Sequence, residues 1–153
     1  MTNPAFILVV DTDPGLRRLL DLILTRGGYL VEAVESPMEA LGLVGERSPD
    51  LVILDIGPAE QHGATFVRLA RRFGWHGPVI VLSADSGWRL AMREIEADAD
   101  IRKPFSPEEL LASVEGMLAE REPPVEGNRF PANARFVSSG QSWPRLVADP
   151  YKY

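Results

Sequence analysis

The sequence predicts an α/β fold in which a doubly wound parallel sheet is covered by helices on both faces. Short apolar runs alternate with segments of helical leucine spacing, and this alternation occurs five times between residues 5 and 121. Helical crossovers between consecutive apolar strands join those strands in parallel. Polar residues follow four of the apolar runs. In sheets of this kind, the carboxyl ends of the strands form the binding edge.

The strands are predicted from continuous apolar runs, which are typical of strands buried on both faces of a sheet. AFILVV and DLVILD are the clearest of these runs. Strands are expected at residues 5–10, 29–34, 50–55, 78–84 and 99–102.

The helices are predicted from apolar spacing and from signals at their ends. Asp13-Pro14 is typical of an N-cap followed by proline at the first helical position. Ser36 and Ser106 each precede a glutamate by three residues, as in a capping box. Gly27-Gly28 is expected to end the first helix. Helices are expected at residues 15–28, 36–47, 63–73, 86–96 and 106–121.

Composition excludes several classes of function. The chain has 153 residues, 45% of them hydrophobic, a net charge of −6 and no cysteine. An acidic chain is a poor non-specific ligand for nucleic acid, and without cysteine it can form neither disulfides nor thiolate metal sites. No apolar run approaches the length of a membrane span, and the first residues do not resemble a signal peptide. We therefore expect a cytoplasmic protein with neither nucleic acid nor membrane as partner.

Residues 1–122 are expected to form one domain, and residues 123–153 a proline-rich C-terminal tail rather than a second domain. The tail has five prolines and no helical period. It carries four basic and two acidic residues, a net charge of +2, whereas residues 1–122 carry 12 basic and 20 acidic residues, a net charge of −8. Because the tail is also rich in aromatic residues, we expect it to pack against the first domain.

Four polar residues at strand ends define a candidate site: Asp11, Asp55, Ser83 and Lys103. Two carboxylates from separate strands can hold Mg²⁺, which prefers oxygen ligands. A lysine and a hydroxyl beside them suit phosphoryl transfer onto a carboxylate, with an aspartate as nucleophile. No glycine-rich phosphate loop follows the first strand, so neither a nucleotide nor a flavin cofactor is expected.

Three further residues are expected to lie outside the candidate site. His62 and His76 are predicted to be surface loop residues rather than metal ligands. Trp88 is predicted to cover apolar surface.

Taken in order, these motifs resemble the receiver domain of bacterial response regulators, from about Phe6 to Glu120. ILVVDTDPGLRRLL resembles the first strand and helix of that family, and DLVILDI resembles its phosphoacceptor strand. VLSA is similar to the fourth strand, and RKPF to the lysine-proline turn. The resemblance implies a flavodoxin-like (βα)5 fold with strand order 2-1-3-4-5, and a stand-alone receiver similar to chemotaxis regulators.

The resemblance also implies roles for the site residues. Asp55 would accept a phosphoryl group from a sensor histidine kinase or a phosphotransfer protein, while Ser83 and Lys103 contact the phosphoryl oxygens. Asp11, Asp55 and the backbone carbonyl of Gly57 would hold Mg²⁺, and the Lys103–Pro104 bond is expected to be cis. Such a receiver is not an enzyme with a separate substrate. It signals through protein–protein contact, and a homodimer is among its expected assemblies.

The sequence departs from the family pattern at three places. Thr12 stands where the family has a second aspartate, so weak Mg²⁺ binding is expected. Either Thr12 or Asp13 is the candidate for the remaining Mg²⁺ ligand. Alternatively, Asp13 serves as a helix N-cap. Asp100 occupies the position of a switch aromatic, and the spacing from Ser83 to Lys103 is only 20 residues. The loop after Asp55 reads IGPAEQHG. Two functions therefore stay open: a phosphorylated receiver, or a degenerate receiver that binds proteins without phosphorylation.

Overall fold

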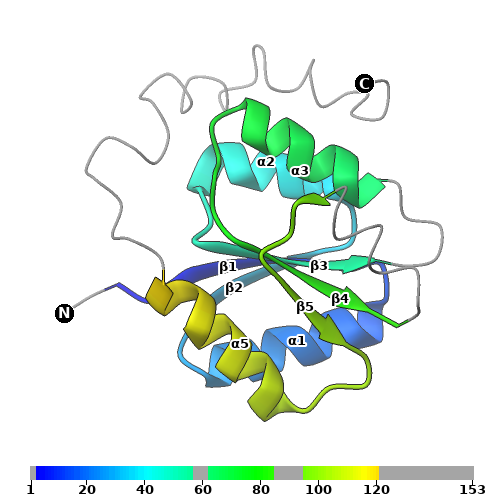
Figure 1. Ribbon diagram of the computed structural model, residues 1–153, viewed down its shortest axis with the longest axis vertical. Helices are drawn as coiled ribbons and strands as arrows, with labels where there is room; N and C mark the ends of the chain where they lie inside the picture. The colour runs from blue at the N-terminus through cyan, green and yellow to red at the C-terminus, as the bar shows by residue number, and fades with distance from the viewer. Residues whose placement is uncertain (1–2, 57–61, 85–94, 121–153) are drawn as a thin grey trace.

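A five-stranded parallel sheet with helices on both faces forms the body of the molecule (Figure 1). The computed structural model describes residues 3–56, 62–84 and 95–120. The strand order is β2-β1-β3-β4-β5, and every neighbouring pair is parallel. The predicted α/β class and the 2-1-3-4-5 order are confirmed. In chain order the elements are β1 (Phe6–Val10), α1 (Pro14–Arg26), β2 (Leu30–Val34), α2 (Pro37–Arg47), β3 (Leu51–Ile56), α3 (His62–Arg72), β4 (Val79–Ser83), β5 (Ala99–Arg102) and α5 (Pro107–Glu120).

Most predicted elements lie within one or two residues of their expected bounds. Four expectations fall outside the described residues: most of the helix at 86–96, the Trp88 side chain, the Gly57 carbonyl and the packing of residues 123–153. No helix in the described ranges is both long enough and apolar enough to span a membrane.

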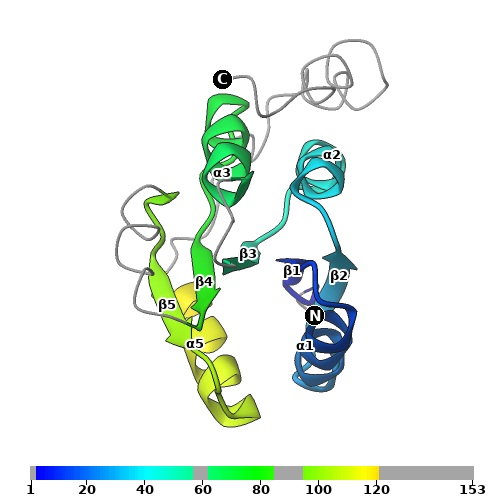
Figure 2. The same ribbon diagram turned by 90° about the vertical axis from the view of Figure 1, so that its right-hand side faces the viewer.

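The sheet separates two apolar cores because successive residues of a strand point to opposite faces. On β1, Ile7 and Val9 pack with residues of α1 and α5, whereas Leu8 and Val10 pack with residues of α2 and α3. Figure 2 shows the resulting three layers, with α1 and α5 on one side of the sheet and α2 and α3 on the other. Since both faces are covered, polar side chains gather at the ends of the strands.

The predicted helix caps are present. The Ser36 hydroxyl accepts from the Glu39 N–H at 3.2 Å, and the Ser106 hydroxyl accepts from the Glu109 N–H at 3.1 Å. After α1 the chain turns through Gly28, whose φ of 96° is a conformation that favours glycine. The two serine caps fix where α2 and α5 begin.

Candidate functional site

Asp11 and Asp55 are brought together by the pairing of β1 with β3. Val10 lies opposite Leu54 in this pairing, so the next residue of each strand is an aspartate. The Asp11 N–H donates to the Val34 carbonyl at 3.0 Å, which holds the end of β1 against β2. Both carboxylates consequently lie at the carboxyl edge of the sheet, as expected.

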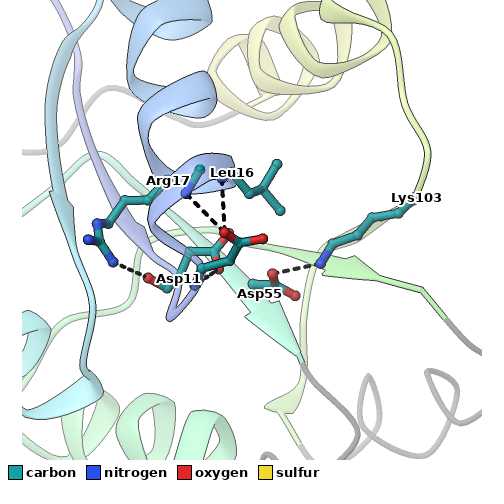
Figure 3. A network of polar contacts seen from close by, with 7 residues as sticks. Asp11, Leu16, Arg17, Asp55 and Lys103 are labelled. Carbon is teal, nitrogen blue, oxygen red and sulfur yellow. Dashed lines mark hydrogen bonds and ion pairs between the residues drawn. The ribbon is translucent and has the colours of Figure 1, made fainter.

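Ser83 and Lys103 are placed at the same edge by β4 and β5. Ser83 is the last residue of β4, and its carbonyl accepts from the Lys103 N–H at 2.8 Å. The Lys103–Pro104 bond is cis, as expected. Figure 3 shows the Lys103 side chain reaching back across the strand ends, where Nζ lies 2.6 Å from Asp55 Oδ2.

Three oxygen atoms at this edge are buried without a hydrogen-bond partner among the described residues. They are Asp11 Oδ2, Asp55 Oδ1 and Ser83 Oγ. Asp11 and Ser83 are each only 2% exposed. A buried oxygen without a partner costs free energy, and such groups in folded proteins usually face a ligand, an ion or water. These oxygens are the groups expected to bind a divalent cation and a phosphoryl group.

The environment of Asp11 disfavours its negative charge. Burial raises the pKa of the Asp11 carboxyl from its ordinary value of 3.8 to about 7, and repulsion from Asp55 adds to this. The hydrogen bond from the Asp13 N–H to Asp11 Oδ1, at 2.9 Å, and the charge of Lys103 lower that pKa only in part. A cation placed between the two carboxylates would remove the repulsion, so this pair fits a divalent metal.

Comparison with known proteins agrees with this arrangement. Residues 7–115 match the sequence model of the response regulator receiver domain. The chain belongs to that family. The receiver fold accounts for the strand order and for the four polar residues at one edge of the sheet.

The curated relatives are longer than the region that matches this chain. Response regulator MprA from Mycobacterium sp. strain KMS is 37% identical over 131 residues, which cover 84% of this chain and 56% of that protein. The virulence transcriptional regulatory protein PhoP from Salmonella typhimurium strain LT2 is 32% identical over 114 residues, covering 73% and 51%. The chain thus spans about half the length of these curated relatives. Among solved structures, chemotaxis protein CheY4 from Vibrio cholerae matches with a TM-score of 0.69 at 26% identity, covering 75% of this chain and 99% of that one.

Asp13 does not extend the acidic site of this receiver. Its carboxylate caps α1, where Oδ1 accepts from the Gly15 N–H at 2.9 Å and from the Leu16 N–H at 3.4 Å. The N-cap alternative from the sequence is therefore confirmed. Thr12 is exposed, and no group of three metal-ligating residues of the His, Cys, Asp or Glu type occurs within the described ranges. Within the described ranges, a cation at this site would therefore have the carboxylates of Asp11 and Asp55 as its charged ligands.

Arg17 is a site residue that the sequence did not reveal. Its Nη1 donates to the Asp11 carbonyl at 2.9 Å, from the first turns of α1 (Figure 3). The neighbouring Arg18 is exposed. Two adjacent arginines are equivalent in the sequence, and only the rotation of α1 separates their roles.

The remaining residues singled out from the sequence lie away from these carboxylates. His76 is exposed, as predicted. His62 is the first residue of α3, so its expected loop position is wrong by one residue. Asp100 lies in β5 opposite Val81 and is half-buried, so a charged side chain stands at the place of the family's aromatic residue.

Asp11→Asn should stabilise the metal-free receiver at neutral pH. The Asp11 carboxyl binds its proton more tightly in the folded state than in the unfolded state. The protonated carboxyl therefore contributes fully to the free energy of unfolding below the unfolded pKa of 3.8, and this contribution is lost as the pH rises through the folded pKa of about 7. Asparagine removes the charge and keeps an oxygen that can accept from Asp13. We expect a gain of about 2–4 kcal/mol near pH 8 and about 1–2 kcal/mol near pH 5.

Urea unfolding in the presence of a chelator at both pH values measures this gain. Asp21→Asn, an exposed carboxylate on α1, is the matched control and should show no such pH dependence. A loss of stability in Asp11→Asn at both pH values would contradict the assignment.

Arg17→Met should weaken Mg²⁺ binding and lower the free energy of unfolding by about 1–2 kcal/mol, since it removes a charged hydrogen bond to the Asp11 carbonyl. Arg18→Met makes the same chemical change at an exposed position and should leave both quantities unchanged. Equal effects of the two substitutions would show that Arg17 does not position Asp11. Mg²⁺ titration and urea unfolding provide the measurements.

Proposed function

We propose that this receiver accepts a phosphoryl group on Asp55 from a sensor histidine kinase or a phosphotransfer protein. The observation that carries the proposal is the ion pair between Lys103 Nζ and Asp55 Oδ2 at 2.6 Å, beside the buried and unpartnered Asp55 Oδ1. One carboxylate oxygen is held by a cation while the other keeps its lone pairs. A carboxylate oxygen with free lone pairs can act as a nucleophile.

In the transfer, an Asp55 oxygen forms a bond to phosphorus as the phosphorus–nitrogen bond of the donor phosphohistidine breaks. The imidazole nitrogen keeps the electron pair of that bond and takes up a proton. Lys103 and the Ser83 hydroxyl are the groups that would contact the oxygens of the transferred phosphoryl group. This chemistry requires chiefly positioning and charge neutralisation, and residues fixed at four strand ends can contribute to both.

Mg²⁺ is the cofactor that fits the donor set. Asp11 and Asp55 would hold it together with the Gly57 carbonyl, and when bound it would neutralise charge on the phosphoryl oxygens. Binding is proposed to be weak, because Thr12 is exposed and Asp13 is engaged as the cap of α1.

The output of the receiver is proposed to be protein–protein contact. Asp55 is itself the group that becomes modified, so the domain acts as a switch rather than as an enzyme with a separate substrate. One relative is named a transcriptional regulatory protein and another a response regulator. The partner that reads this receiver is accordingly proposed to belong to a signalling pathway.

A second candidate function is a degenerate receiver that binds its partner without phosphorylation. The exposed Thr12 and the charged Asp100 favour it, since they stand where the family has a metal ligand and a switch aromatic. The half-buried Asp55, paired with Lys103, favours the first candidate.

Acetyl phosphate with Mg²⁺, or a beryllofluoride mimic of the phosphoryl group, should modify wild-type protein at Asp55 alone. Intact-mass spectrometry after acetyl phosphate should show one phosphoryl addition that Asp55→Asn abolishes and Asp21→Asn retains. If wild type gains no mass under conditions that label another receiver in the same tube, the phosphoacceptor proposal fails and the degenerate receiver stands.

Thr12→Asp should tighten Mg²⁺ binding, speed the phosphorylation of Asp55 and lower metal-free stability together. Changes around a metal site already alter affinity by roughly 10–100-fold, so a new charged ligand should act at least as strongly. The added charge also repels Asp11 and Asp55 when no metal is bound. Thr12→Asn adds similar volume without charge and is the control. Unchanged Mg²⁺ affinity in Thr12→Asp would show that this side chain does not face the site.

A further inference from the structure

We propose that the C-terminal tail of this chain docks through Arg129 and Phe130 into a cavity at the amino edge of the sheet. The cavity has a volume of about 320 Å³ and is lined by His76, Pro78, Asp98, Met117 and Glu120. The proposal does not rest on the phosphorylation of Asp55.

The cavity lies at the opposite end of the sheet from the carboxylate site. Pro78 directly precedes β4 and Asp98 directly precedes β5, while Met117 and Glu120 belong to the last turn of α5. Asp55 and Lys103 lie at the other ends of their strands. An occupant of this cavity therefore leaves the carboxylate site open.

The lining combines apolar contact surface with negative charge. Met117 and Pro78 supply the apolar part, and a methionine thioether makes favourable contacts with aromatic rings. Asp98 and Glu120 supply two carboxylates, and the Asp98 carboxylate is fixed because Oδ2 accepts from the Val79 N–H at 2.8 Å. Arginine is the side chain that best matches a fixed carboxylate, so an arginine next to an aromatic residue suits the whole cavity.

The chain that continues from Glu120 carries such a pair. Arginine followed by phenylalanine occurs twice in the tail, at 129–130 and at 135–136, and residues 123–153 have a net charge of +2 against −8 for residues 1–122. The tail is thus complementary to the domain in charge and to the cavity in side-chain type. Glu120, just before the tail begins, itself lines the cavity, so the short tether provides an effective concentration on the order of millimolar there.

The first Arg–Phe pair is favoured over the second by chain length. Eight residues separate Glu120 from Arg129, and at about 3.3 Å per residue they can span some 25 Å, enough to turn back to the cavity. Gly127-Asn128 directly precedes the pair and suits a reversal of the chain. A longer loop to Arg135 would cost more closure entropy.

Methyl NMR on the full chain provides the test. The protein has four methionines, so ¹³C-methyl labelling of methionine gives a simple spectrum in which Met117→Leu identifies the Met117 signal. A docked Phe130 ring should displace this signal, and Phe130→Ala should return it toward the position expected for a methyl group without an aromatic neighbour. Phe136→Ala, the matched control, should leave it in place. Met38, on α2 across the sheet, reports any global change.

A charge exchange tests the arginine. Arg129→Glu should reduce the displacement of the Met117 signal, and adding Glu120→Arg should restore it, while Arg135→Glu should have no effect. The proposal is overturned if the signal is the same in wild type and Phe130→Ala, or if Phe136→Ala acts as strongly. A displacement that grows with protein concentration would also overturn it, because the occupant would then be a second copy of the chain.

Discussion

The candidate site depends on holding two like charges together at one buried edge of the sheet. Asp11 and Asp55 follow paired residues of β1 and β3, so the sheet itself determines their proximity. Repulsion between carboxylates is strong where water is excluded, and Lys103 offsets it through its ion pair with Asp55. The strand order, the cis turn that carries Lys103 and the packing of both cores all serve to keep these groups at the same edge.

The loop after β1 shows how the same few residues divide structural and functional work. Asp11 accepts from the Asp13 N–H, Asp13 caps α1, and Arg17 of α1 donates back to the Asp11 carbonyl. This closed set of hydrogen bonds fixes the Asp11 carboxylate but occupies Asp13. The proposed metal site is then left with Asp11 and Asp55 as its charged ligands, and its metal-free state carries less repulsion than a site with three carboxylates would.

The fold was predictable because the signals that define it are local. Continuous apolar runs specify strands buried on both faces, and Ser36 and Ser106 mark helix starts with short-range hydrogen bonds. Four residues of the site were predictable because each follows or ends a strand, and the carboxyl ends of parallel strands lie at the same edge of the sheet. The sequence could not predict features that depend on side-chain orientation. Arg17 contacts Asp11 and Arg18 does not share this role, because the rotation of α1 turns the two side chains in different directions. The cap role of Asp13 stayed open because a shift of one residue at a strand end turns a side chain to the opposite face.

The helix α5 runs between the two ends of the sheet that carry the carboxylate site and the cavity. Three residues separate Lys103 from the start of α5, and Glu120 ends the helix. It therefore runs from the carboxylate site to the cavity over 14 residues, about 21 Å. Ser106 caps its first turn, which ties the position of α5 to the Lys103 loop. A displacement of Lys103 that carried α5 with it would also shift Met117 and Glu120. A tail seated in that cavity would then report the state of a site that it never touches.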